Sequence, residues 1–280
     1  NAKFDLKFLA QAGVTTEGGL FDTMIAAQLL QAGLPKKEKG AKLGAIAQKY
    51  LGVDLPKEEQ LSDWAAESLT KSQVQYSAND AAILLPLRDV LKKQLIQAKL
   101  VEVATLEFDC IVALAEMELT GIMLDQGQWK DYCQVIEENI SEYRAILMDR
   151  FKGFKTDTGD PINLNSTQQL QKALAEIDIH VSSTSKDALE PLTDHPVVVE
   201  LLAYKKWQSQ KSKYGNKISQ AVNLVTGRIH ADYHQLGADT GRLSCSNPPL
   251  QQIPKSVEVR QCFIPGPNCK FVIADYSQIE

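Results

Sequence analysis

Apolar residues recur at intervals of three and four along most of the first 224 positions, and this spacing predicts a chain rich in helices. The predicted helices cover 24–30, 43–51, 74–95, 106–119, 129–151 and 196–224, and a shorter one begins after 166. After Gly227 the apolar runs become shorter, which predicts strands over 228–235, 259–264 and 270–274. The pattern therefore indicates an α+β fold in which helices dominate.

Glycine and polar residues mark several helix ends. Gly52 and Gly121 each follow the last apolar residue of a helical pattern, where glycine commonly ends a helix. Ser166 and Gln169 have the spacing of a capping box, which predicts the start of the shorter helix. The segment 35–42 is charged and begins with proline, so we expect a loop there.

The composition is that of a soluble globular protein. The chain has 280 residues, of which 44% are apolar and 23% are charged, enough for a large core and more than one domain. No segment approaches the roughly 20 apolar residues of a membrane span, so we expect no membrane partner. The five cysteines form no CxxC pair, which favours reduced thiols in the cytoplasm and argues against a zinc knuckle.

The net charge of -5 by itself disfavours nucleic acid as a partner, but the charge is unevenly distributed. Residues 200–280 contain ten Lys and Arg against six Asp and Glu, a net charge of +4, which leaves -9 for the rest of the chain. A basic segment of this kind can neutralise phosphates, so a nucleic-acid partner remains compatible with the composition.

The last eleven residues contain the strongest functional signal. An apolar run, 271–274, is followed by Asp275, so the pattern predicts a buried strand with a carboxylate at its end. Residues 276–280 then suggest a tight turn that opens a helix, with Glu280 as a second carboxylate. An aspartate after a strand is also typical of a helix cap or a turn, and Glu280 could be a surface residue in a first helical turn.

Two ordered motifs give this region a family resemblance. Asp-Tyr-Ser-Gln-Ile-Glu, residues 275–280, resembles motif A of the family A DNA polymerases. Upstream, Thr-Gly-Arg-Leu-Ser at 240–244 and Pro-Leu-Gln-Gln-Ile-Pro at 249–254 resemble a second segment of that family. Pro249 and Gln252 depart from it, because asparagine is common at both positions.

The resemblance implies template-directed nucleotidyl transfer assisted by two Mg²⁺ ions, with Mn²⁺ as a possible substitute. Asp275 is then the ligand that bridges the two ions, and the backbone carbonyl of Tyr276 completes the site. The backbone of Ser277 and Gln278 would lie along the incoming triphosphate. Glu280 would exclude ribonucleotides, because a bulky side chain occupies the space that a 2′-hydroxyl needs.

The resemblance also assigns contacts with primer-template DNA. Arg242 would reach minor-groove acceptors that all four bases share, so it would test pair geometry without reading sequence. Gln251 and Gln252 would contact template or primer nearby. Lys211 and Lys213 lie in a lysine-rich segment that resembles the thumb, where they would neutralise phosphates, although such lysines are often only solvated surface.

A second group of residues near the start resembles a DnaQ-like 3′-5′ exonuclease domain. Tyr76 and Asp80 are four residues apart, so a helix would bring phenol and carboxylate to one face. With Asn1-Ala2-Lys3-Phe4-Asp5 and Phe21-Asp22-Thr23, they match the second and third motifs of that domain. The resemblance implies that Asp5 and Asp80 bind metal and that Tyr76 orients the attacking water. The first motif, Asp-x-Glu, is expected before Asn1.

Residues 1–97 are thus expected to form a partial DnaQ/RNase H-like exonuclease domain. Residues 98–280 are expected to form the helical thumb and the start of the antiparallel palm sheet of a polymerase. The chain is expected to be truncated at both ends, inactive alone in both reactions, and to come from a monomeric cytoplasmic or nucleoid enzyme that binds primer-template DNA and dNTPs. The alternatives are a ribonuclease D-like exonuclease and a non-catalytic DNA-binding protein.

Overall fold

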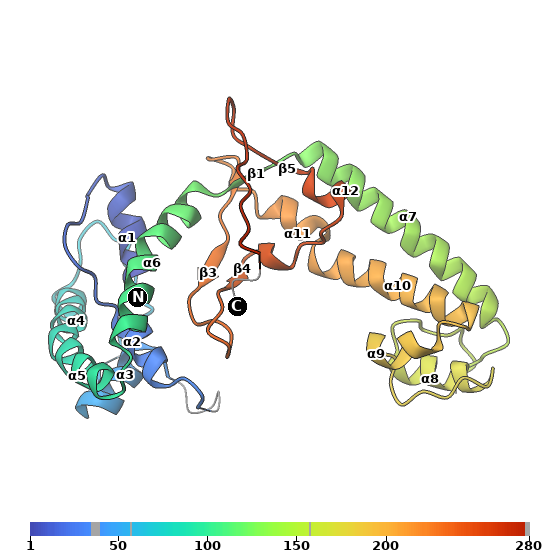
Figure 1. Ribbon diagram of the computed structural model, residues 1–280, viewed down its shortest axis with the longest axis horizontal. Helices are drawn as coiled ribbons and strands as arrows, with labels where there is room; N and C mark the ends of the chain where they lie inside the picture. Colours follow the sequence, from blue (N-terminus) through green and yellow to red (C-terminus); the bar gives the residue numbers. More distant parts are fainter. Residues whose placement is uncertain (35–39, 57, 157, 278–280) are drawn as a thin grey trace. The chain divides into compact units, whose positions relative to one another are not determined.

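The computed structural model describes residues 1–34, 40–56, 58–156 and 158–277. The chain divides into two compact units. The first unit contains 1–121 and 230–251, and the second contains 122–229 and 252–280. Figure 1 traces the described elements along the chain. Within these ranges, no helix is both long and apolar enough to cross a membrane.

Six helices build most of the first unit: α1 (Ala2–Gln11), α2 (Thr23–Leu30), α3 (Leu43–Leu51), α4 (Lys71–Ala82), α5 (Leu84–Gln97) and α6 (Val101–Thr120). Helix α2 packs against α5 and α6, α3 packs against α5, and α1 packs against α6. Ile25, Leu87, Leu91 and Ile111 are buried in this core. Burial of these apolar faces is what stabilises helices as short as α2 and α3.

A β-hairpin completes the first unit. Strand β3 (Asp232–His234) pairs antiparallel with β4 (Ser244–Ser246), so that Tyr233 lies opposite Cys245. The connection is tightly folded at Gly237, where an added Cβ would come within 2.0 Å of the Ser244 hydroxyl oxygen. Glycine is therefore the residue that fits at this close approach. The short helix η3 (Leu250–Gln252) follows the hairpin.

The second unit is built on a pair of long helices, α7 (Gln126–Arg150) and α10 (Pro196–Lys213), which pack along each other (Figure 1). The shorter helices are α8 (Thr167–Ala175), α9 (Lys186–Leu189), η2 (Glu190–Leu192), α11 (Gly215–Gln220) and α12 (Val257–Arg260). Strands β2 (Arg228–Ile229), β1 (Ile122–Leu124) and β5 (Phe263–Ile264) form an antiparallel sheet in that order. Trp129, Leu147 and Leu201 are fully buried in this unit.

The predicted fold class, α+β with helices dominating and antiparallel strands, is confirmed. The helix predicted over 43–51 ends where expected, at Gly52, whose φ of 69° is left-handed. The capping box predicted at Ser166 is half formed: Ser166 accepts from the Gln169 backbone N–H, but the Gln169 side chain accepts from Asn163 instead. The predicted loop over 35–42 lies largely outside the described residues.

Two predicted helices are each divided in two. The helix predicted over 74–95 breaks at Ile83, between α4 and α5. Pro86 lies in the first turn of α5, where its missing N–H and its ring are incompatible with a continuous helix from residue 82. The helix predicted over 196–224 breaks at Tyr214, and the Trp129 indole donates to the Gly215 carbonyl next to this break.

The three predicted strands agree least with the structure. The segment 228–235 forms two separate strands, and 259–264 begins in helix α12 and is extended only at β5. The prediction of a buried strand over 270–274 is wrong: these residues have no regular structure, and Val272 and Ile273 are 94% and 88% exposed. A strand needs a neighbour to pair with, and no strand of the described chain pairs with this segment.

Candidate functional site

The Tyr76 and Asp80 side chains meet on helix α4, as their spacing predicted. They are half-buried, and the phenol hydroxyl hydrogen-bonds the carboxylate. Burial, and secondarily the neighbouring carboxylate, raises the pKa of Tyr76, so the phenol stays neutral and can donate. Burial raises the pKa of Asp80, and the hydrogen bond from Tyr76 partly opposes this effect.

Trp64 contacts Tyr76, a feature that the sequence analysis did not identify. The centroids of the two rings lie 6.0 Å apart, and the Trp64 indole donates to the Glu59 carbonyl at 3.0 Å. The buried Gln73 amide donates to the Asp63 carbonyl at 2.9 Å, which ties the loop containing Trp64 to the start of α4. Gln73 also forms a capping box with Thr70, and this three-residue spacing was the available sequence signal.

Asp5 lies on the exposed face of α1. The same helix directs Lys3 and Lys7 toward Glu118 of α6. The nearby Asp22, from the Phe-Asp-Thr motif, is buried and caps α2 by accepting from the Met24 and Ile25 backbone N–H groups. Asp22 is therefore a structural cap.

Arg242 lies in the connection between β3 and β4 and is exposed. The connection is closed by backbone hydrogen bonds from Gly241 to the Ala238 carbonyl and from Ala238 to the Arg242 carbonyl. Gln251 and Gln252, in η3, also have exposed side chains. The hairpin thus presents Arg242 at the surface of the first unit.

The two lysines that were expected to neutralise phosphates differ in their surroundings. Lys211 and Lys213 are exposed in the last turn of α10, and Lys211 forms an ion pair with Glu137 of α7 at 2.7 Å. Such an exposed pair contributes little to stability, so Lys211 can leave Glu137 at small cost. Nearby, the Lys206 ammonium lies 5.6 Å from the centre of the Trp207 ring.

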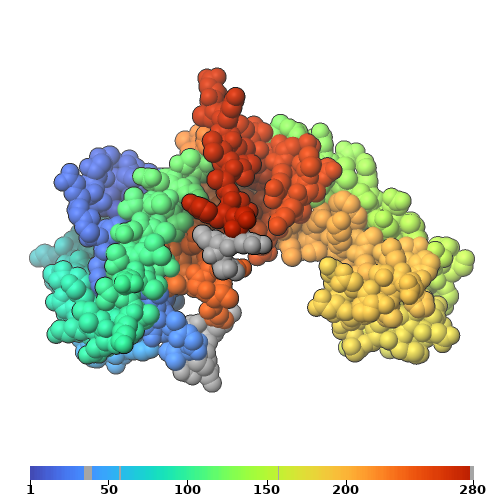
Figure 2. All heavy atoms as spheres, viewed as in Figure 1, coloured from blue at the N-terminus to red at the C-terminus, as the bar shows by residue number. Residues whose placement is uncertain are grey.

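The residues of the last motif are on the surface. Asp275, Tyr276 and Ser277 are exposed, and Figure 2 shows the final red part of the chain at the molecular surface. Gln278 and Glu280 lie outside the described residues. Across the ranges that the structure describes, no three His, Cys, Asp or Glu side chains gather in a group that could hold a metal ion.

A cavity of about 730 Å³ lies in the second unit, between α7, α10 and residues 254–261. Tyr132 and Trp207 are among the residues that line it. Tyr132 donates a hydrogen bond to the Gln210 side chain, and burial, aided by nearby acidic groups, raises the pKa of Tyr132 to about 12. None of the predicted site residues is among the described residues that line this cavity.

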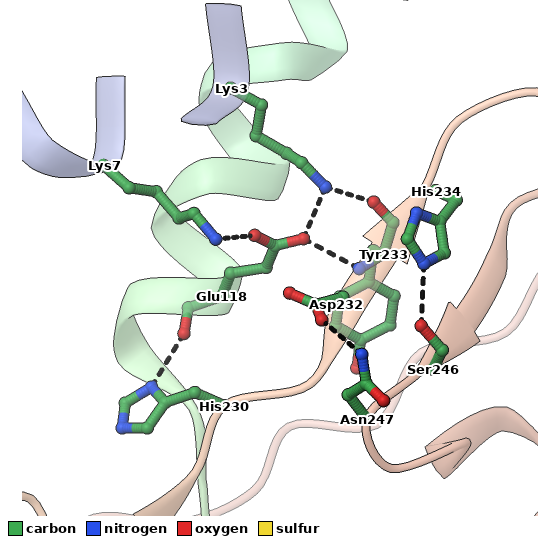
Figure 3. A network of polar contacts seen from close by, with 9 residues as sticks. All are labelled: Lys3, Lys7, Glu118, His230, Asp232, Tyr233, His234, Ser246 and Asn247. Atoms are coloured by element: carbon green, nitrogen blue, oxygen red, sulfur yellow. Dashed lines mark hydrogen bonds and ion pairs between the residues drawn. The ribbon is translucent and has the colours of Figure 1, made fainter. Parts of the chain in front are cut away.

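A polar network around Glu118 lies in the first unit, beside the hairpin that carries Arg242 (Figure 3). The Glu118 carboxylate accepts from Lys3 and Lys7 at 2.5 Å each and from the Tyr233 backbone N–H at 2.7 Å. The His230 ring also contacts the Glu118 carbonyl, with its Nδ1 atom at 2.7 Å. Sequence reasoning missed this network, because its members are separated by more than 100 positions.

Comparisons with known proteins give two family matches in order along the chain. Residues 1–96 match the model of a 3′-5′ exonuclease, and residues 131–280 match the model of DNA polymerase family A. Among curated proteins, the chain is 36% identical to DNA polymerase I of Chloroflexus aurantiacus over 306 residues. It is 33% identical to DNA polymerase I of a Synechocystis strain over 301 residues.

These alignments cover all of this chain but only 31% and 29% of the two relatives, so the chain spans about a third of their length. Among solved structures, the polymerase domain of Pol1 from M. smegmatis, in complex with DNA primer-template and dNTP, matches with a TM-score of 0.77 at 28% identity. That match covers 95% of this chain and 45% of the other.

Proposed function

The chain belongs to DNA polymerase family A, and we propose that it serves in template-directed DNA synthesis, joined to a 3′-5′ exonuclease domain that removes nucleotides from the primer end. The observation that carries the proposal is the match of 95% of the chain to a polymerase whose structure contains primer-template DNA and a dNTP. The proposed partners are accordingly primer-template DNA and dNTPs.

The two family matches support a division into an exonuclease part, 1–97, and a polymerase part, 98–280. For synthesis we propose that Arg242, Gln251 and Gln252 contact DNA near the primer end and that Lys211 and Lys213 contact phosphates. Exposure of all five side chains is compatible with these roles.

The residues proposed at the incoming nucleotide are those of the last motif, Asp275, Tyr276, Ser277, Gln278 and Glu280. For hydrolysis we propose Asp5, Tyr76 and Asp80. The neutral phenol of Tyr76 donates its one O–H to Asp80, so its oxygen is suited to accept a hydrogen bond from the attacking water and to orient it.

The cofactor proposed for both reactions is a divalent metal ion, Mg²⁺ by preference or Mn²⁺. Carboxylates such as Asp5, Asp80 and Asp275, and a backbone carbonyl such as that of Tyr276, are the oxygen donors that these ions take. The proposal rests on this donor chemistry. When bound, the metal ions would supply charge stabilisation to phosphoryl transfer. We also propose that the protein is a monomer and that it lies in the cytoplasm. The five free cysteines support the cytoplasmic location.

Primer extension tests the proposed polymerase. The full-length protein that contains this chain is incubated with a 5′-labelled primer-template, dNTPs and Mg²⁺, and extension is followed on a gel. Asp275→Asn is expected to lower kcat by at least about 100-fold, because several kcal/mol of transition-state stabilisation depend on the metal site. The matched control is Asp194→Asn, an exposed aspartate of the second unit, which should retain activity.

Degradation of a mispaired primer end tests the exonuclease. Tyr76→Phe removes the hydroxyl that would orient the attacking water and is expected to slow nucleotide removal by about 10²–10⁴-fold, the usual range for a positioned side chain that assists proton transfer. Tyr50→Phe, in helix α3, is the control. No extension by the wild-type protein would overturn the polymerase proposal. In that case, preferential trimming of single-stranded RNA would favour a ribonuclease D-like enzyme.

A further inference from the structure

The Glu118 carboxylate is the most deeply buried charge in the first unit's polar network, with a side chain that is 2% exposed. Burying a carboxylate is costly unless charged or polar donors replace the lost water. Here two ammonium groups, from Lys3 and Lys7, and one backbone N–H, from Tyr233, supply that replacement. Burial alone would raise the pKa of Glu118, but the three donors together outweigh burial and lower the pKa below its ordinary value, so the carboxylate is ionised at neutral pH.

The network holds both backbone polar groups of Tyr233. Its N–H donates to Glu118, and its carbonyl accepts from the Lys3 ammonium. Because both groups bond to residues outside the hairpin, they point away from β4 and would be unpaired without the network. Glu118 and Lys3 therefore pair the free edge of β3 with helices α6 and α1 (Figure 3).

Further hydrogen bonds join the two strands of the hairpin and tie it to α6. The Asn247 amide donates to Asp232 at 3.0 Å, and the His234 ring lies 2.7 Å from the Ser246 hydroxyl. Gln235, at the end of β3, donates to the backbone and side chain of Glu107 on α6 at 2.7 Å. Movement of β3 relative to α1 and α6 would therefore carry the whole connection, including Arg242.

Helix α1 connects the Glu118 network, which anchors the hairpin, to Asp5 of the proposed exonuclease site. Asp5 lies between Lys3 and Lys7 in sequence, on the exposed face of the helix, while the two lysines face Glu118. One buried carboxylate thus fixes both the helix that carries Asp5 and the hairpin that carries Arg242. The apolar packing of α1 against α6 does not by itself set the position of β3.

We propose that Glu118 is a positioning residue: by binding Lys3, Lys7 and the edge of β3, it holds Arg242 where the polymerase recognises the primer end. This inference rests on the proposed function. It predicts that loss of the Glu118 charge weakens primer recognition through Arg242, beyond any general effect on stability.

The test uses the full-length protein with Glu118→Gln, which keeps the side-chain volume but removes the charge. We expect kcat/KM for extension of a matched primer to fall by about tenfold or more, with a rise in the KM for primer-template. Glu118→Gln combined with Arg242→Ala should be no slower than Arg242→Ala alone, because both changes act on one interaction. The matched control is Glu200→Gln, which breaks the exposed ion pair with Arg150.

Two further measurements keep the test decisive. Lys7→Met removes one donor and leaves Lys3 in place, so it should give a smaller loss in the same direction if Glu118→Gln folds poorly. Hydrogen exchange reports the anchor independently of activity: the Tyr233 amide should lose protection in Glu118→Gln and keep it in Glu200→Gln. Unchanged protection of the Tyr233 amide in Glu118→Gln would overturn the inference. A double variant whose loss of kcat/KM is the product of the two single losses would also overturn it. Absence of extension by the wild-type protein would instead overturn the proposed function, and exchange would still test the anchor.

Discussion

At the scale of single residues, the contact between Trp64 and Tyr76 shows how a neighbour can tune a candidate catalytic group. The indole lies next to the phenol, with the two rings tilted by 53°, and Trp64 is itself 40% exposed. Removal of water from the phenol is the main reason that the pKa of Tyr76 is raised above its ordinary value. Trp64 therefore helps to keep Tyr76 in its neutral, hydrogen-donating form.

We predict that Trp64→Ala lowers the pKa of Tyr76 toward 10, its value in water, because the phenolate becomes better solvated. The sign follows from the charged form being the deprotonated one: water favours it, so exposure promotes loss of the proton. A pH titration of ¹³C-labelled tyrosine followed by NMR measures the change. Trp207→Ala, in the second unit, should leave the Tyr76 titration unchanged, and equal titrations in all three proteins would contradict the prediction.

At the scale of elements, helix ends follow local rules closely. Gly52 ends α3 in a left-handed conformation with φ of 69°, and its N–H donates to the Gln48 carbonyl at 3.1 Å. A residue with a Cβ is strained there by roughly 1–2 kcal/mol. The position was correctly predicted from the glycine after the last apolar residue of the helical pattern.

Gly52→Ala is accordingly expected to reduce the free energy of unfolding by about 1 kcal/mol. Gly153→Ala is the control: that glycine has no positive φ and has open space around it, so alanine should be neutral or slightly stabilising. Urea denaturation of both variants measures the difference. A Gly52→Ala protein as stable as Gly153→Ala would show that the helix end rearranges without strain.

Strands follow different rules, and this explains the main errors of the sequence analysis. Val272 and Ile273 have high strand propensity, yet the segment that contains them is unpaired. Val259 belongs to an apolar run that predicted a strand, but it is fully buried on one turn of helix α12. Short apolar runs do not distinguish a strand from a buried helical turn.

At the scale of the whole molecule, the chain forms two compact units with separate apolar cores. Leu91, on α5, is fully buried in the first, and Leu201, on α10, is fully buried in the second. The chain passes from the first unit to the second at 121–122 and returns at 229–230, so the first unit is discontinuous in sequence. Separate cores of this kind can unfold in separate steps.

We predict two thermal transitions, each sensitive to one core. Leu91→Ala and Leu201→Ala should each destabilise by about 2–5 kcal/mol, through lost burial and the cavity left behind. Calorimetry should show each variant lowering a different transition temperature. A single transition that both variants lower equally would show instead that the two cores unfold as one cooperative unit.

The candidate site could be predicted only where its geometry is local. Tyr76 and Asp80 meet because a helix brings positions four apart together, whatever surrounds it. Arg242 was identified through a motif that is contiguous in sequence, but its exposed position in the connection between β3 and β4 was not predicted. The Trp64 contact and the Glu118 network were not predicted, because they depend on how segments distant in sequence pack.

Local sequence accounts for the helical character of the chain and for many helix ends, because helix hydrogen bonds and caps join residues within four positions of each other. It also determined the family, through motifs that are contiguous in sequence. The packing of distant segments brings Lys3, Lys7 and Tyr233 to Glu118 and leaves residues 270–274 without a strand partner. Strand pairing and buried ion pairs require a partner from elsewhere in the chain, and three-dimensional packing alone supplies it.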